Sequence, residues 1–278
     1  MEKQLQKTNR VKAYLENVDV QEKLRDVLKN KTTEFIASLL SATSSNELLV
    51  ECEPGTVFNA ALTAASLGLP INQNLGFAYI IPYKNKSGKY EAQFQMGYKG
   101  YIQLAQRSGL YRTINATDVK EGELKGKNRL TGEVEFEWID NDEERAKLST
   151  VGYLAFFETT TGFQKTRYMS KSELESHGKK FSQSFKRGYG LWKDDFDSMA
   201  IKTVIKLLIS KYGPMTTELG KAVELDQAVV EGEVTVYPDN YKDKPEIPEK
   251  TEEDKKKIKD EAAKLAEELA GGEEKEDE

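Results

Sequence analysis

The stretch YEAQFQMGYKGYIQLAQRSG, residues 90–109, decides the fold. Over residues 90–98, aromatic and aliphatic side chains alternate with glutamate and glutamine. This period of two predicts a β-strand with one buried face. Gly97 and Gly100 interrupt the strand, and the residues up to 107 predict a short helix.

Hairpins and a capped helix surround this unit. The apolar run 77–83 precedes a polar turn, so it predicts the partner strand. Residues 151–157 and 163–168 flank a Thr-Thr-Thr-Gly turn and predict a second hairpin. Ser170 and Glu173 have the spacing of a capping box, which predicts a helix start. We therefore expect an α+β protein, in which helices pack on antiparallel hairpins or sheets.

Helical periodicity covers much of the rest of the chain. Residues 1–53 show three amphipathic segments separated by polar clusters. Thr56 is the expected N-cap of a helix that ends at Gly68. A long helix is predicted from near Asp194 to just before Gly213.

Composition divides the chain further. We predict four segments: a helical N-terminal region (1–53), an α+β core (54–215), a linker (216–250), and an acidic, mostly disordered tail that contains a helix (251–278).

Charge is unevenly distributed along the 278 residues, whose net charge is -6. Residues 81–215 hold 23 basic and 17 acidic side chains, whereas residues 216–278 hold 10 basic and 21 acidic ones. A basic body with an acidic appendage is typical of a polyanion-binding protein.

Several function classes lack their residues. With one cysteine, Cys52, and one histidine, His177, the chain forms neither an internal disulfide nor a usual structural zinc site. It has no signal-like N-terminus and no apolar run of about 20 residues, so we expect a cytoplasmic protein without membrane contact. No phosphate-binding loop is present.

The best carboxylate cluster is Asp194, Asp195 and Asp197. It leaves a metal nuclease open, but acids at a helix start are usually explained by the helix dipole. We therefore expect no catalytic and no metal-binding residue, and no enzyme activity.

Basic residues carry the functional prediction. Residues 165–211 contain 11 Lys/Arg and 5 Asp/Glu, interleaved with aromatic rings. Cations that track phosphates and rings that stack on bases are what sequence-independent binding of single strands requires. An ordinary solvated face remains the alternative for any single stripe.

The predicted DNA-binding residues lie on the short helix, the strands, a loop and the long helix: Lys99, Gln103, Arg107, Arg112, Lys165, Arg167, Lys179, Lys180, Lys186, Arg187, Lys193, Lys202 and Lys206. A predicted arm for a second strand or a neighbouring subunit contains Lys125, Lys127 and Arg129.

Four blocks of sequence over residues 50–215 resemble the RecT family of phage and prophage single-strand annealing proteins. They are Gly68-Leu69-Pro70 with residues 78–83, residues 95–102, Arg107-Ser108-Gly109, and Trp192 with residues 199–205.

The resemblance implies a β-β-β-α core related to that of Redβ. It also implies a recombinase that binds single-stranded DNA, anneals it without ATP into duplex, and assembles into rings or helical filaments. Expected partners are a 5′→3′ exonuclease and the host single-strand-binding protein, both through the C-terminal region. We expect a phage- or prophage-encoded protein in a bacterial cell. No cofactor is expected to be required, and a role for Mg²⁺ stays open with no site identified.

Three other functions stay open. A passive single-strand-binding protein would share the basic groove without speeding pairing. A nuclease would need the Asp194 cluster. A scaffold would bind proteins through the predicted helix at 251–270.

Overall fold

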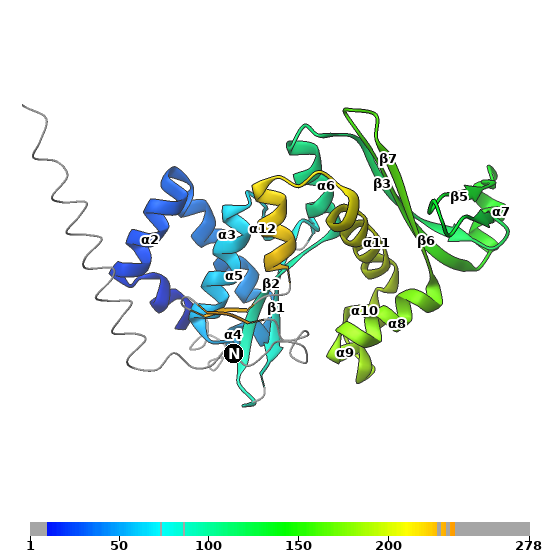
Figure 1. The fold of residues 1–278 in the computed structure, drawn as a ribbon. Coiled ribbons are helices and arrows are strands. Elements are labelled where there is room, and N and C mark those ends of the chain that lie inside the picture. The colour runs from blue at the N-terminus through cyan, green and yellow to red at the C-terminus, as the bar shows by residue number, and fades with distance from the viewer. Residues whose placement is uncertain (1–9, 73, 86, 227–228, 232–233, 237–278) are drawn as a thin grey trace, which may run out of the picture. The chain divides into compact units, whose positions relative to one another are not determined.

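The computed structural model describes residues 10–226 except 73 and 86, together with residues 229–231 and 234–236 (Figure 1). The predicted tail at 251–278 lies outside these residues. Mixed helices and antiparallel strands confirm the α+β prediction.

The N-terminal part is helical. Residues 10–15 form a first helical segment. It is followed by α2 (Val18–Leu28), η1 (Lys29–Lys31), α3 (Thr32–Ser44), α4 (Glu47–Glu51) and α5 (Pro54–Ser66). Asn17 and Asn46 accept hydrogen bonds from the first backbone N–H groups of α2 and α4, which fixes both helix starts.

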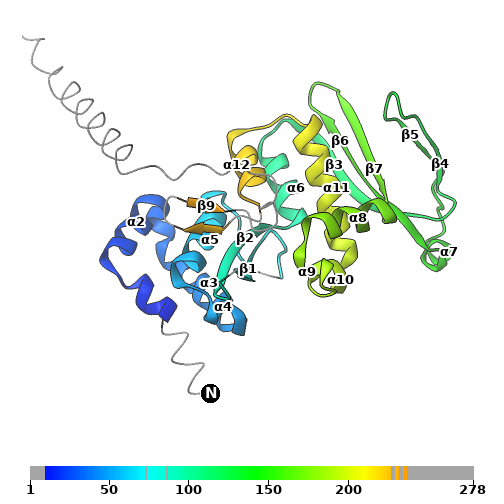
Figure 2. The same ribbon diagram turned by 60° about the horizontal axis from the view of Figure 1, so that its bottom comes forward.

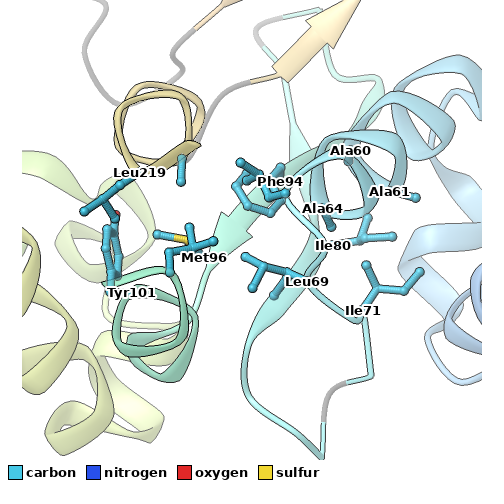
Figure 3. Close-up of a cluster of buried hydrophobic side chains, with 14 of the residues drawn as sticks. Ala60, Ala61, Ala64, Leu69, Ile71, Ile80, Phe94, Met96, Tyr101 and Leu219 are labelled. Atoms are coloured by element: carbon cyan, nitrogen blue, oxygen red, sulfur yellow. The ribbon is translucent and has the colours of Figure 1, made fainter. Parts of the chain in front are cut away.

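Helix α5 packs on a two-stranded hairpin. Its small residues Ala60, Ala61 and Ala64 are buried, so the backbone comes close to the strands (Figure 3). The predicted N-cap at Thr56 is wrong, because Glu53 caps the helix. The Thr56 hydroxyl lies inside α5 and accepts a hydrogen bond from the Ala92 backbone N–H at 2.9 Å.

That hairpin consists of β1 (Ala78–Lys84) and β2 (Tyr90–Met96), with Ile80 opposite Phe94. Strand β2 is buried on both faces, not on one as predicted. Gln93 and Gln95 are buried too, and the Gln95 amide lies 3.9 Å from the sulfur of Met199. A helix from later in the chain therefore covers the face that alternation assigns to water.

Gly97 joins β2 to α6 (Tyr98–Arg107), and Gly100 lies in the first turn of that helix. A Cβ atom on Gly97 would lie 2.1 Å from the Gly76 carbonyl oxygen, and one on Gly100 would lie 2.3 Å from the Phe77 carbonyl oxygen. Only glycine allows this close backbone contact.

A three-stranded antiparallel sheet follows, in the order β3 (Tyr111–Lys120), β6 (Thr150–Thr159) and β7 (Gln164–Ser170). The predicted second hairpin is β6–β7, in which Leu154 pairs with Tyr168. Inserted between β3 and β6 are the hairpin strands β4 (Leu124–Lys127) and β5 (Val134–Phe136) and the helix α7 (Asp142–Lys147).

Four helices come after the sheet: α8 (Lys171–Phe181), α9 (Gln183–Lys186), α10 (Leu191–Asp194) and α11 (Phe196–Tyr212). The predicted capping box of Ser170 and Glu173 opens α8. The long helix α11 contacts β3, β6 and β7 as well as α6 (Figure 2).

The linker predicted at 216–250 starts too early. Residues Thr217–Leu225 form α12, in which Leu219 and Ala222 are fully buried. Figure 3 shows Leu219 beside Met96 and Tyr101. Two short strands follow, β8 (Val229–Glu231) and β9 (Val234–Val236), and β8 lies against α5 and β2. Helix α12 and strands β8 and β9 therefore belong to the first compact unit, Met1–Asp239. The second unit, Asn240–Glu278, lies outside the described residues.

Candidate nucleic-acid interface

The two predicted DNA-binding lysines of α11, Lys202 and Lys206, do not line an open groove. Lys202 is only 5% exposed, and its ammonium nitrogen lies 3.0 Å from Oδ1 of Asp226. The Lys206 ammonium lies 2.7 Å from Oδ2 of the same carboxylate. The assignment of Lys202 to an open DNA groove is therefore wrong, because α11 packs against the sheet and α6, and Asp226 covers its two lysines.

The Asp226 carboxylate is completely buried and accepts four hydrogen bonds. Besides the two lysines, the Met96 backbone N–H donates to Oδ1 at 2.9 Å and the Tyr101 hydroxyl donates to Oδ2 at 3.0 Å. Burial alone would raise the pKa of Asp226, but the two ammonium groups lower it to about 2. Burial removes water from the Lys202 ammonium and lowers its pKa; the attraction of Asp226 opposes this effect, and the repulsion from Lys206 adds to it.

The three predicted DNA-binding residues of α6 differ in their surroundings. Lys99 is exposed and Gln103 is half-buried. Arg107 donates to the Leu67 carbonyl at 2.8 Å and forms an ion pair with Glu218 of α12 at 2.9 Å. Arg107 is therefore already engaged by the C-terminal helix.

On the sheet, Arg112 is largely exposed and pairs with Glu158 at 3.1 Å. The Lys165 ammonium donates to the Thr131 carbonyl at 2.7 Å and lies 5.3 Å from the centre of the Tyr212 ring. Arg167 differs from both, since its Nε is buried without a hydrogen-bond partner. A buried, unpaired guanidinium N–H is costly and favours an anion nearby.

Cations converge around His177, which is half-buried on α8 and packs against Phe181 with the ring centres 4.6 Å apart and the rings tilted by 49°. Burial lowers the pKa of this imidazole. Three positive charges lower it further, and they come from three elements: Lys206 of α11, Arg167 of β7 and Lys180 of α8. We call Arg167, His177, Lys180 and Lys206 the cation cluster.

The predicted basic loop is mostly helical, since Lys179 lies on α8, Lys186 on α9 and Lys193 on α10, but its cations are open. Lys179, Lys186, Arg187 and Lys193 are all exposed. The interleaved aromatics mostly serve packing instead of base stacking. Trp192 is 6% exposed and stacks on Phe185 at 5.7 Å, whereas Tyr189 is 55% exposed.

The predicted arm exists as the β4–β5 hairpin, on the β7 side of the sheet (Figure 2). Lys125 pairs with Glu137 at 2.9 Å, Lys127 lies 5.8 Å from the Tyr168 ring centre, and Arg129 is exposed near the tip. Phe136 stacks on Trp138, which is 46% exposed.

The acidic and thiol candidates have structural explanations. Asp195 caps α11 by accepting from the Ser198 backbone N–H, and Asp197 accepts from the Tyr153 hydroxyl. Among the described residues, no three His, Cys, Asp or Glu side chains are arranged to hold a metal ion. Burial raises the pKa of the Cys52 thiol to about 12, so it is not a nucleophile.

The geometry therefore offers a cation cluster and an open basic loop on the helical side of an antiparallel sheet. A model of the RecT family matches residues 33–261. The chain belongs to the RecT family.

Two relatives agree with this assignment. The chain is 45% identical to the protein YqaK of Bacillus subtilis strain 168 over 213 residues, which cover 77% of this chain and 70% of YqaK. It is 29% identical to the protein RecT of Escherichia coli K12 over 245 residues, covering 80% of this chain and 86% of that protein.

RecT-family membership supports a general role in single-strand annealing and recombination. The family match also extends past the predicted linker, so it includes α12 and Asp226. Sequence reasoning missed both, although the spacing of Leu219 and Ala222 is a weak helical signal. Within the described residues, no helix is long and apolar enough to span a membrane.

Proposed function

We propose that this protein anneals complementary single DNA strands without ATP, in an oligomer whose subunits present a continuous basic surface. The observation that carries the proposal is the cation cluster, where Arg167, Lys180 and Lys206 come from three different elements of a RecT-family fold. Such convergence suits a phosphate chain that crosses several elements.

Annealing is slowed by electrostatic repulsion between the strands and needs no energy from ATP hydrolysis. Stacking supplies about 1.4 kcal/mol per base-pair step, so pairing is downhill once the strands meet. The cation cluster, with the loop residues Lys179, Lys186, Arg187 and Lys193, would neutralise phosphates and leave base edges free. Tyr189 is the exposed ring of this loop and is placed to stack on a base.

One subunit offers few phosphate contacts, so oligomerisation belongs to the proposal. Residues 1–53 would pack subunits together, and the β4–β5 arm with Arg129 at its tip would reach the second strand or a neighbour. The C-terminal region would contact a 5′→3′ exonuclease and the host single-strand-binding protein. We place the protein in the cytoplasm of a bacterial host, encoded by a phage or prophage, with no cofactor required.

The test is annealing of two complementary oligonucleotides without nucleotide triphosphate. We expect Arg167→Gln and Lys180→Ala to weaken strand binding on all sequences alike and to reduce the salt slope by about 0.7 per lost contact. Lys89→Ala removes an exposed charge from the turn between β1 and β2, outside the interface and outside residues 1–53, and serves as the matched control. Equal slopes for all three variants would remove the cation cluster from the interface.

A passive single-strand-binding protein is the alternative function. It would bind the first oligonucleotide with the same salt dependence but would leave the rate of pairing unchanged or lower it. The annealing rate with and without protein therefore distinguishes the two.

A further inference from the structure

The acidic residues of α12 contact three of the predicted DNA-binding cations. Glu218 forms an ion pair with Arg107 of α6 at 2.9 Å. Asp226, directly after the helix, pairs with Lys202 and Lys206 of α11 at 3.0 and 2.7 Å. One short segment, residues 217–226, thus supplies both carboxylates, and we call it the strap.

The donors around Asp226 are of the kind that holds a phosphate oxygen. They comprise a backbone N–H, a tyrosine hydroxyl and two ammonium groups, all on one carboxylate. Two ammonium charges face one carboxylate charge. The site therefore keeps an excess positive charge and continues to attract a polyanion.

Two buried apolar residues anchor the strap in the core, and its two paired carboxylates lie on either side of them. Leu219 and Ala222 are buried in the core, but Glu224 points to solvent. The ion pair of Glu218 with Arg107 is largely exposed, and such pairs exchange partners readily.

We propose that the strap is an autoinhibitory mimic of a DNA backbone, whose carboxylates occupy Arg107, Lys202 and Lys206 until strand phosphates displace them. This inference rests on the proposed function. It makes binding depend on strand length, because a strand must offer enough phosphates elsewhere to displace the strap.

Hydrogen exchange tests the displacement directly. The full chain is measured alone and with a saturating thymidine oligonucleotide. We expect the backbone amides of residues 223–226, which follow the buried anchors Leu219 and Ala222, to lose protection on DNA addition, while those of the buried strand β2 keep theirs. Retained or increased protection of the strap in the DNA complex would overturn the proposal.

A pair of matched variants tests the competition. Glu218→Gln and Glu224→Gln each remove one negative charge from α12, but of the two only Glu218 is seen to pair with a predicted DNA-binding cation, Arg107 of α6. We expect E218Q to bind the oligonucleotide up to about fivefold tighter than E224Q, the range that an exposed ion pair supports. The difference should fade at high salt. Equal affinities for the two variants at low salt would contradict the mimic.

Asp226→Asn is the stronger perturbation, and its folding is checked first by thermal melting. If it folds, we expect tighter strand binding than in the unchanged protein; weaker binding would argue against the proposal. If it does not fold, hydrogen exchange and E218Q still decide. Failure of the proposed function looks different, because the unchanged protein would then fail to speed the pairing of two complementary oligonucleotides, whatever the strap variants do to binding.

Discussion

Replacing Lys202 with methionine tests the buried ion cluster most sharply. The change keeps the length of the side chain and removes the ammonium that lies 3.0 Å from Asp226. Removing one partner of a buried pair costs about 3–5 kcal/mol, because the other charge is left without compensation. Asp226 keeps Lys206 and two neutral donors, so we expect the lower end, about 3 kcal/mol. For a chain of this size, that lowers Tm by about 6–12 °C.

The assay is urea denaturation of the DNA-free protein at pH 7, with Lys221→Met as the control. Lys221 is an exposed residue of α12, so its replacement should change the free energy of unfolding by at most about 0.5 kcal/mol. If K202M and K221M unfold at the same urea concentration with equal slopes, the ammonium of Lys202 is not a buried partner, and our account of the cluster is wrong.

The pH dependence of this cluster has a definite sign. The pKa of Asp226 is about 2 in the fold, below its unfolded value of about 3.9. Its stabilising contribution is therefore fully present above the unfolded pKa and is lost as the pH falls through about 2. The difference between K202M and the unchanged protein should stay constant from pH 5 to 8 and shrink in stronger acid.

Further outcomes are expected for truncation of the chain, for the pH dependence around His177, and for replacement of glycine. Truncation after residue 215 should unfold the protein, since it removes α12, whereas truncation after residue 239 should leave its melting curve nearly unchanged. Because its pKa is lowered, His177 is neutral at pH 7, whereas a bound phosphate favours the protonated form. Strand affinity, measured by fluorescence anisotropy, should therefore rise below about pH 6.5. His177→Gln should flatten this pH response. Without DNA, the same shift should make the fold less stable as the pH drops below about 6.5. Gly100→Ala should cost about 1–3 kcal/mol or more in urea unfolding because its Cβ meets a carbonyl oxygen, while Gly220→Ala on α12 should be neutral or stabilising.

Local patterns in the sequence predicted much of the fold. Alternation predicted β2, the Thr-Thr-Thr-Gly turn predicted the β6–β7 hairpin, and the spacing of Ser170 and Glu173 predicted the start of α8. These signals work because hairpins and caps depend on neighbouring residues. Periodicity did not predict the burial of Gln95, since the covering residue Met199 lies 104 positions later in the chain.

The candidate site was predictable in its charge but not in its pairing. Counting lysines and arginines located the basic region that contains Arg167 and Lys180. It did not reveal that Asp226 forms ion pairs with both Lys202 and Lys206, because Asp226 lies in a stretch without a strong helical signal. Ion pairs between distant segments depend on how α11 and α12 come together, and single-sequence patterns carry no such information.

The environments of the two tryptophans make the protein its own optical probe. Trp138 lies half in water on the arm, whereas Trp192 is enclosed behind the open loop. Collisional quenchers should therefore dim the first and spare the second. Replacing Trp192 with phenylalanine would leave only the arm tryptophan to fluoresce, and replacing Trp138 would leave only the enclosed one. Contacts of the arm and ordering around Trp192 would then be followed as separate fluorescence signals without any attached dye.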